Sequence, residues 1–143
     1  MDKKQLRDTF LHSLQQIYDM ELVAPLMEFC QGEMRVLLYL DSHKTCDIYP
    51  SDLSESLFVT RQRITTILSA LRKKGYITME TAESDRRRMK ITLSRTGQHY
   101  VLKKRSFAEH YFDLLVESLG EENMMEFNRL VQLTATKMEG LIK

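Results

Sequence analysis

Four apolar residues between positions 60 and 74 recur at helical spacing, and this pattern constrains the fold more than any other in the chain. They are Ile64, Ile67, Leu68 and Leu71. At 100° per residue they form one narrow stripe, which has to be buried against a core. Gly75 follows as a C-terminal stop, because glycine readily takes the left-handed conformation that ends helices. The sequence therefore predicts a helix from Thr60 to Lys74 with one buried and one exposed face.

Shorter elements on either side of this helix predict a helix-turn-helix followed by a hairpin. Pro50 is suited to the first position of a short helix that reaches Leu57, since its missing N–H is not needed there. A short extended piece at residues 48–49 precedes that helix. Farther along, the alternation of Ile91 with Leu93 behind a charged loop predicts two strands, 76–80 and 89–93.

Longer segments on both sides of this motif read as helices. Apolar periodicity predicts amphipathic helices over residues 3–22, 94–119 and 121–142 and a buried helix over 31–40. Pro25 is expected to interrupt the first helix or bend its end, and Ser94 to cap the start of the 94–119 helix. The chain of 143 residues is long enough for one domain with a substantial core. The expected fold class is mainly α with a small β-hairpin (α+β).

The terminal helices favour association of two copies of the chain. In segment 121–142 apolar residues recur every three or four positions, a heptad-like seam that requires a partner helix. The alternative is that these helices pack only within one subunit. The residues expected in a dimer interface are Leu6, Phe10, Leu14, Phe127, Val131 and Met138.

Charge is distributed unevenly although the whole chain carries a net charge of only +1. Residues 1–60 contain 5 basic and 10 acidic side chains, residues 61–105 contain 13 and 3, and residues 106–143 contain 3 and 7. A basic centre between acidic ends indicates a surface for a polyanion, with association or sensing at the ends. A solvated, lysine-rich helix surface is the alternative explanation of the charge alone.

The exposed face of the 60–74 helix has the chemistry of a surface that contacts DNA bases. No acidic residue occurs from Val59 to Met79, whereas an ordinary solvent-facing helix would carry glutamates among its lysines. Glutamine suits adenine, arginine suits guanine, and threonine methyl groups contact thymine. Many amphipathic helix pairs imitate this motif, so it is only moderately specific. The candidate DNA-binding residues here are Thr60, Arg61, Gln62, Arg63, Thr65, Thr66, Ser69 and Lys73.

The hairpin loop adds a second candidate contact. Arg86, Arg87 and Arg88 follow Asp85, which is expected to orient a guanidinium through a bidentate pair. Such a loop can reach the minor groove or the flanking backbone, and an ordinary arginine-containing surface loop is the alternative. Ser51, at the start of the shorter helix, is a candidate phosphate contact.

Together these segments resemble the MarR family of bacterial transcription regulators. The resemblance rests on VTRQRITTILSALRKKGYI and ESDRRRMKITLSRTG, in which Asp85 and Arg87 are followed after five residues by Leu93 and Ser94. It implies a winged helix-turn-helix homodimer over residues 1–143, with a DNA-binding lobe at 31–97 and dimerisation helices at 1–28 and 98–143. Relatives often have glycine at the position of Phe58, so the turn between the two helices is expected to be strained or reshaped.

The resemblance further implies a repressor that a small molecule releases from a pseudo-palindromic operator. Its effector pocket is expected near His12, Tyr18 and Tyr39. Cys30 is read as the N-cap of the 31–40 helix, with Glu33 in the capping-box position, and is a hypothetical redox trigger because a thiol at a helix start oxidises readily. A small buried cysteine is the alternative.

Other classes of function find less support. No nucleophile–base pair, phosphate-binding glycine loop or paired-carboxylate site indicates an enzyme, and no pattern indicates a metal or cofactor. A helical dimeric adaptor that binds an acidic protein partner is the main alternative to a DNA-binding regulator. The absence of a long apolar run or signal-like segment predicts a cytoplasmic protein with no membrane partner.

Overall fold

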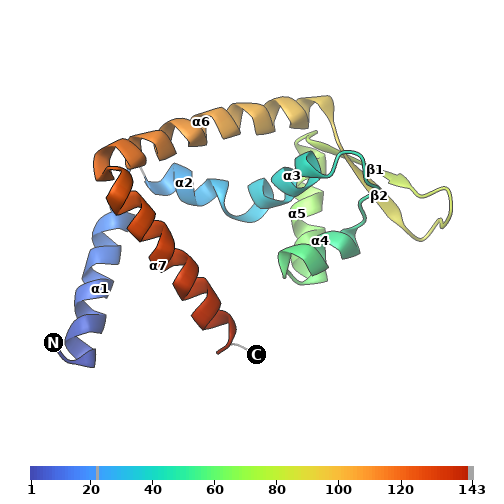
Figure 1. Cartoon of the computed structure of the whole chain (residues 1–143). Coiled ribbons are helices and arrows are strands. Elements are labelled where there is room, and N and C mark those ends of the chain that lie inside the picture. The colour runs from blue at the N-terminus through green and yellow to red at the C-terminus, as the bar shows by residue number, and fades with distance from the viewer. Residues whose placement is uncertain (22, 142–143) are drawn as a thin grey trace. The chain divides into compact units, whose positions relative to one another are not determined.

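The computed structural model describes residues 1–21 and 23–141 and shows helices interrupted by one β-hairpin (Figure 1). The elements are α1 (Lys3–Tyr18), α2 (Val23–Phe29), α3 (Gly32–Ser42), α4 (Pro50–Leu57), α5 (Arg61–Lys73), β1 (Ile77–Thr81), β2 (Met89–Leu93), α6 (Arg95–Leu119) and α7 (Glu121–Glu139). The chain divides into two compact units, one from Met1 to Ala108 and one from Glu109 onward. The helix-turn-helix and the hairpin both lie in the first unit.

The N-terminal region contains one helix more than the sequence pattern predicts. α1 ends at Tyr18, and Leu22, the expected end, lies outside the described residues. Pro25 does not bend the first helix but lies in the first turn of α2. A backbone N–H there has no partner within the helix, so its absence from proline removes no helical hydrogen bond. Asp2 caps α1 by accepting from the Gln5 N–H at 2.8 Å, and the Gln5 side chain accepts in return from the Asp2 N–H.

The core of the first unit lies among α3, α4, α5, the hairpin and the start of α6. Its fully buried side chains are Val36, Leu37, Leu53, Ile64, Leu71 and Val101. Each large apolar side chain buried in this way contributes about 1.5–3 kcal/mol. The predicted stripe of the 60–74 helix is therefore buried, and it fixes α5 against α3 and α4.

The start of α3 differs from its prediction. Gln31, not Cys30, is the N-cap, and Cys30 is exposed rather than buried. Glu33 does not form a capping box but reaches Lys74 beside the end of α5, with 2.6 Å between the carboxylate and Nζ. The hydrogen bond from Glu33 raises the pKa of Lys74 above its usual value. The pair links α3 to the end of α5.

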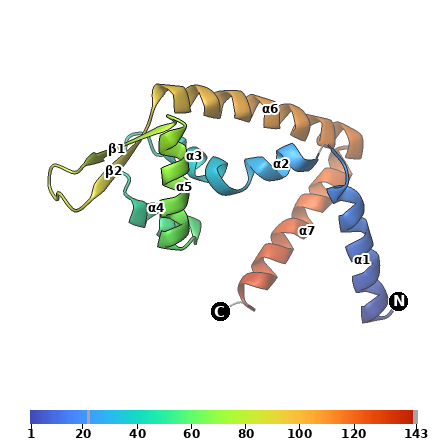
Figure 2. The ribbon, with the colours of Figure 1, turned by 180° about the vertical axis from the view of Figure 1, so that it is seen from behind.

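The hairpin is a two-stranded antiparallel sheet in which Ile77 pairs with Leu93 and Thr81 with Met89. Ile48 adds a bridge to Ile91 from the segment before α4, which confirms the predicted extended piece. Ala82 N–H donates to the Arg88 carbonyl at 2.9 Å and closes the loop. Viewed from behind, the hairpin extends beyond the helices next to α4 and α5 (Figure 2).

Gly97 allows α6 to begin close to the end of α5. A Cβ atom at this position would lie 2.1 Å from the Tyr76 carbonyl oxygen, so the approach requires glycine. Ser94 caps α6 as predicted, because its hydroxyl accepts from the Gly97 N–H at 3.0 Å. α7 begins after Gly120 and ends at Glu139, and Ile142, the predicted end, lies outside the described residues.

Candidate nucleic-acid interface

α5 presents the predicted polar face to solvent. All eight candidate residues from Thr60 to Lys73 are exposed, whereas the four residues of the apolar stripe are buried. The Thr60 hydroxyl caps the helix by accepting from the Arg63 N–H at 3.2 Å. The buried face of α5 therefore holds the helix in the core, and the exposed face is free to contact a ligand.

Two threonines on this face donate their hydroxyl protons to carbonyl groups of the helix backbone. Thr65 donates to the Arg61 carbonyl at 2.9 Å, and Thr66 donates to the Gln62 carbonyl at 3.1 Å. Each hydroxyl oxygen is thus left as an acceptor, and each methyl group remains available for apolar contact. This combination suits the amino groups and thymine methyl groups of the major groove.

The start of α4 lies beside α5 and the hairpin. Ser51 is half-buried in the first turn of α4, and the carboxylate of Asp52 accepts from the Tyr49 N–H at 2.9 Å. One of the free amides at this end is therefore already satisfied. Ser51 remains the predicted phosphate contact of α4, through its hydroxyl.

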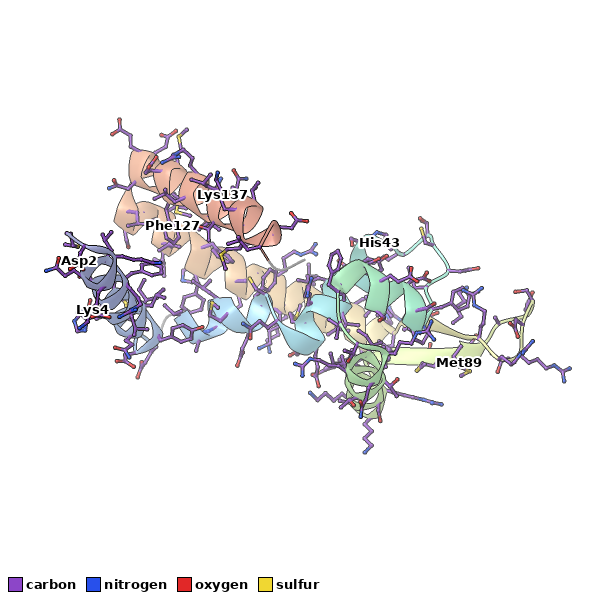
Figure 3. The ribbon with its side chains drawn as sticks, turned by 90° about the horizontal axis from the view of Figure 1, so that it is seen from below. Asp2, Lys4, His43, Met89, Phe127 and Lys137 are labelled. Carbon is purple, nitrogen blue, oxygen red and sulfur yellow. The ribbon has the colours of Figure 1, made fainter. Side chains whose placement is uncertain are left out.

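A single open cleft of about 390 Å³ brings three of these elements together. Its described lining includes three arginines and no acidic side chain, so it has a positive electrostatic potential. The lining residues are Tyr49, Pro50, Ser51, Arg61, Thr65, Met79, Arg87, Arg88 and Met89. Met89 is labelled on the hairpin in Figure 3, next to the loop that extends away from the helices.

Two of the hairpin arginines, Arg87 and Arg88, have different environments, and the third, Arg86, is exposed and does not line the cleft. Arg87 is 94% exposed, and its Nε lies 3.6 Å from the Asp85 carboxylate, too far for a hydrogen bond, so the predicted bidentate pair is not formed. Asp85 instead accepts from the Arg87 backbone N–H at 2.9 Å, because the tight turn brings that amide closer than the guanidinium. Arg88 lies over the Tyr49 ring, 3.7 Å from its centroid, a cation–π contact between the hairpin and the start of α4.

Tyr49, Met79 and Met89 line the cleft but were missed by sequence reasoning. Tyr49 precedes Arg88 by 39 positions, and the two meet where the bridge from residue 48 joins this segment to the hairpin. Each of these residues also fits an ordinary strand or helix-end pattern. No local signal in the sequence identified them.

The turn between α4 and α5 retains its left-handed residue although that residue is not glycine. Phe58 has φ 55° and ψ 45°, and it is the one non-glycine residue with positive φ in the described chain. A side chain in this conformation costs about 1–2 kcal/mol. The turn is therefore strained, as the sequence predicts.

The predicted effector residues lie in two places. His12 and Tyr18 are exposed on α1, whereas Tyr39 is half-buried on α3. The Tyr39 hydroxyl lies 3.2 Å from the Ser56 hydroxyl, and its ring stacks on His43 with 4.1 Å between centroids. These contacts join α3 to α4, and the prediction that the three residues share a pocket stays untested.

A different, smaller pocket opens between α2, α3 and α6. It measures about 50 Å³. Its lining is Pro25, Glu28, Phe29, Met34, Tyr100, Lys104, Phe107 and Ala108. Cys30 lies on a separate cavity of about 210 Å³ whose wall includes Arg35 and Arg63.

The six residues predicted for the dimer interface are all exposed. Leu6, Phe10 and Leu14 lie on α1, and Phe127, Val131 and Met138 lie on α7. Across residues 1–21 and 23–141, no three His, Cys, Asp or Glu side chains gather closely enough to hold a metal ion. In the same ranges, no helix is both long and apolar enough to span a bilayer.

A short helix, a longer helix with an exposed polar face and a basic hairpin define a winged helix-turn-helix fold. Residues 31–88 match the MarR family, and 66 residues are 36% identical to the HTH-type transcriptional regulator PapX of Escherichia coli. That alignment covers 46% of this chain and 40% of PapX, so the chain spans well under half the length of this curated relative.

Solved structures share the fold along nearly the whole chain. YusO of Bacillus subtilis is 19% identical with a TM-score of 0.69, covering 95% of this chain and 99% of YusO. MepR in the S. aureus MepR–DNA complex is 23% identical with a TM-score of 0.67, covering 100% and 99%. Residues 31–88 therefore match the MarR family, and nearly the whole chain shares the winged helix-turn-helix fold of these solved structures.

Proposed function

We propose that this protein is a sequence-specific, double-stranded DNA-binding regulator of transcription. One observation carries the proposal: Arg61 and Thr65 of α5, Ser51 of α4, and Arg87 and Arg88 of the hairpin line one cleft without an acidic side chain. Phosphate contacts supply most of the affinity of such a surface, and contacts to base edges supply its specificity.

The proposed roles follow from chemistry and position. α5 has 13 residues and, at 1.5 Å each, a length of about 20 Å, which fits along a major groove. Its N-terminal turn, with Gln62 and Arg63, would contact bases. Arg87, almost fully exposed at the hairpin loop, would enter the adjacent minor groove.

The first test is binding to random duplexes of about three helical turns over a salt series. We expect the logarithm of affinity to fall with the logarithm of salt concentration with a slope near −6 or steeper. A folded protein with weak, salt-independent binding would contradict the proposal and favour the protein-binding adaptor. A steep slope would justify selecting the operator from the same pool.

The proposal includes a homodimer on a pseudo-palindromic operator. The exposed apolar side chains of α1 and of α7 support it, since contiguous apolar surface of this kind marks association sites. A two-fold dimer places its two α5 helices on half-sites about one helical turn apart. Operator selection would test this directly, because a dimer enriches inverted repeats and a monomer enriches single half-sites.

Repression with release by a small molecule is the regulatory part of the proposal. A bound dimer would block access of polymerase to a promoter that overlaps the operator, in the bacterial cytoplasm. The pocket on α2, α3 and α6 is far smaller than the roughly 300–1,000 Å³ of typical ligand sites, so an effector would have to enlarge it. A reporter with the selected operator tests repression: expression should rise when the protein is deleted.

Oxidation of Cys30 is the alternative mode of release. The thiol is exposed and shares a cavity with Arg63 of α5, so an adduct there would disturb a proposed DNA contact. Peroxide should then release the wild-type protein from its operator but not Cys30→Ser. Equal release of both proteins would exclude Cys30 as the trigger.

A further inference from the structure

We propose that the Phe58 ring contacts the C5-methyl group of a thymine next to the bases that the start of α5 reads. The inference rests on the DNA-binding function proposed above and adds a contact that none of the polar candidates supplies. It assigns a ligand to the turn of the helix-turn-helix, which otherwise serves only to connect α4 and α5.

Phe58 has two unfavourable properties in the free protein. Its backbone is in the left-handed region, at φ 55°, where glycine or asparagine is the unstrained choice. Its side chain is 93% exposed, so burial of the ring does not offset the strain. Strain that the folded protein does not offset indicates a role in binding.

The turn holds Phe58 in place from both sides. The Phe58 and Val59 N–H groups both donate to the Ser54 carbonyl, the latter at 3.2 Å. The Ser54 hydroxyl donates to the Val59 carbonyl at 2.6 Å. Leu57 is buried and Val59 is half-buried. The exposed ring is therefore attached to a fixed backbone and loses little backbone freedom when it meets a partner.

The position of the turn favours DNA as that partner. Phe58 lies two residues before Thr60, the N-cap of the helix whose first turn would contact bases. The following sequence carries arginines and no acidic residue up to Met79. Phe58 is therefore next along the chain to the helix turn that would contact bases. An acidic protein partner could also pair with these arginines but would not explain an aromatic ring at the groove edge.

Thymine is the base that an apolar ring can recognise. Its methyl group is the one apolar feature that B-DNA displays in the major groove, and phenylalanine is among the side chains that contact it. A phenyl ring carries no charge and removes no phosphate counterion. Its contribution should therefore depend on sequence and leave the salt dependence unchanged.

Substitution of Phe58 should change stability and affinity in opposite directions. We expect Phe58→Asn to raise Tm by about 3 °C, because asparagine tolerates the left-handed conformation. We expect the same variant to bind the selected operator about 5- to 10-fold more weakly, with an unchanged salt slope. Phe58→Tyr retains the ring and should bind like wild type.

A methyl-deletion scan identifies the contact on the DNA. Each operator thymine is replaced in turn by uracil, which differs only in lacking the methyl group. Wild-type protein should bind about fourfold more weakly when one particular thymine per half-site is replaced, the effect of one buried methyl group. Phe58→Asn should show no change in affinity at that thymine.

The outcomes separate this inference from the function on which it rests. Wild-type protein without salt-dependent DNA affinity would overturn both. In the second outcome, wild-type protein binds DNA with the expected salt slope, but each uracil replacement changes its affinity as much as it changes that of Phe58→Asn. This outcome would overturn the thymine contact alone. A thymine whose methyl effect disappears with the ring would establish it.

Discussion

Apolar side chains are buried in the winged-helix lobe (residues 31–97) but exposed on the terminal helices α1 and α7. In the lobe, Ile64 and Leu71 are completely buried. α1 and α7 have no buried residue at all among their described positions, although both have a clear apolar face. The lobe therefore has its own core, whereas the terminal helices leave large apolar side chains exposed. We infer that folding energy lies mainly in the lobe and association energy in the ends.

The largest effect expected from this comparison is the removal of a core side chain. Leu71→Ala should reduce the free energy of unfolding by about 2–5 kcal/mol at any protein concentration. Leu14→Ala on α1 should have a smaller effect that grows weaker as protein is diluted. Urea unfolding at two protein concentrations measures both effects. An equal loss of unfolding free energy in the two variants at both concentrations would contradict the difference between the lobe and the terminal helices.

Disruption of the α1 face should affect association rather than folding. Phe10→Glu places a charge on an exposed apolar face, so we expect monomers that keep their helical content. Because a dimer gains avidity from two half-sites, its operator affinity should fall about 100-fold or more. Sedimentation velocity and operator titration check the two effects. A Phe10→Glu protein that remains dimeric would refute the proposed interface.

Two kinds of substitution within the lobe should separate affinity from specificity. Arg87→Ala should weaken binding to all sequences and make the salt slope less steep by about 1 for each phosphate that is no longer neutralised. Gln62→Ala or Arg63→Ala should instead reduce discrimination, roughly 10-fold or more at one base pair. Unchanged operator affinity in Arg87→Ala would contradict its assigned role in the minor groove.

The smallest effect concerns Arg88, which stacks on Tyr49 and so positions the hairpin. Tyr49→Leu should lower operator affinity about threefold without changing the salt slope, since no phosphate contact is removed. Tyr49→Phe keeps the ring and is the control. A Tyr49→Leu variant with a shallower slope would indicate that Arg88 contacts phosphate directly.

Local sequence predicted the elements of the lobe closely because their signals are short-range. The α4 bounds, the α5 stripe, the Ser94 cap and the hairpin strands follow from spacing, proline chemistry and alternation within about fifteen residues. The helix at Pro25 was missed because a proline in a first turn and a proline that ends a helix give the same local pattern. The residues of the polar α5 face were predictable because burial of the stripe fixes their exposure.

The sequence by itself determined which face of α5 is exposed, which loop carries the basic side chains and which turn is strained. Only the tertiary structure decided the partners of side chains far apart in the chain. Glu33 meets Lys74 across 41 positions instead of capping its own helix, and Arg88 stacks on Tyr49 instead of extending with Arg87. Periodicity depends on neighbours along one helix or strand, whereas such contacts depend on how elements pack, which a local pattern does not contain.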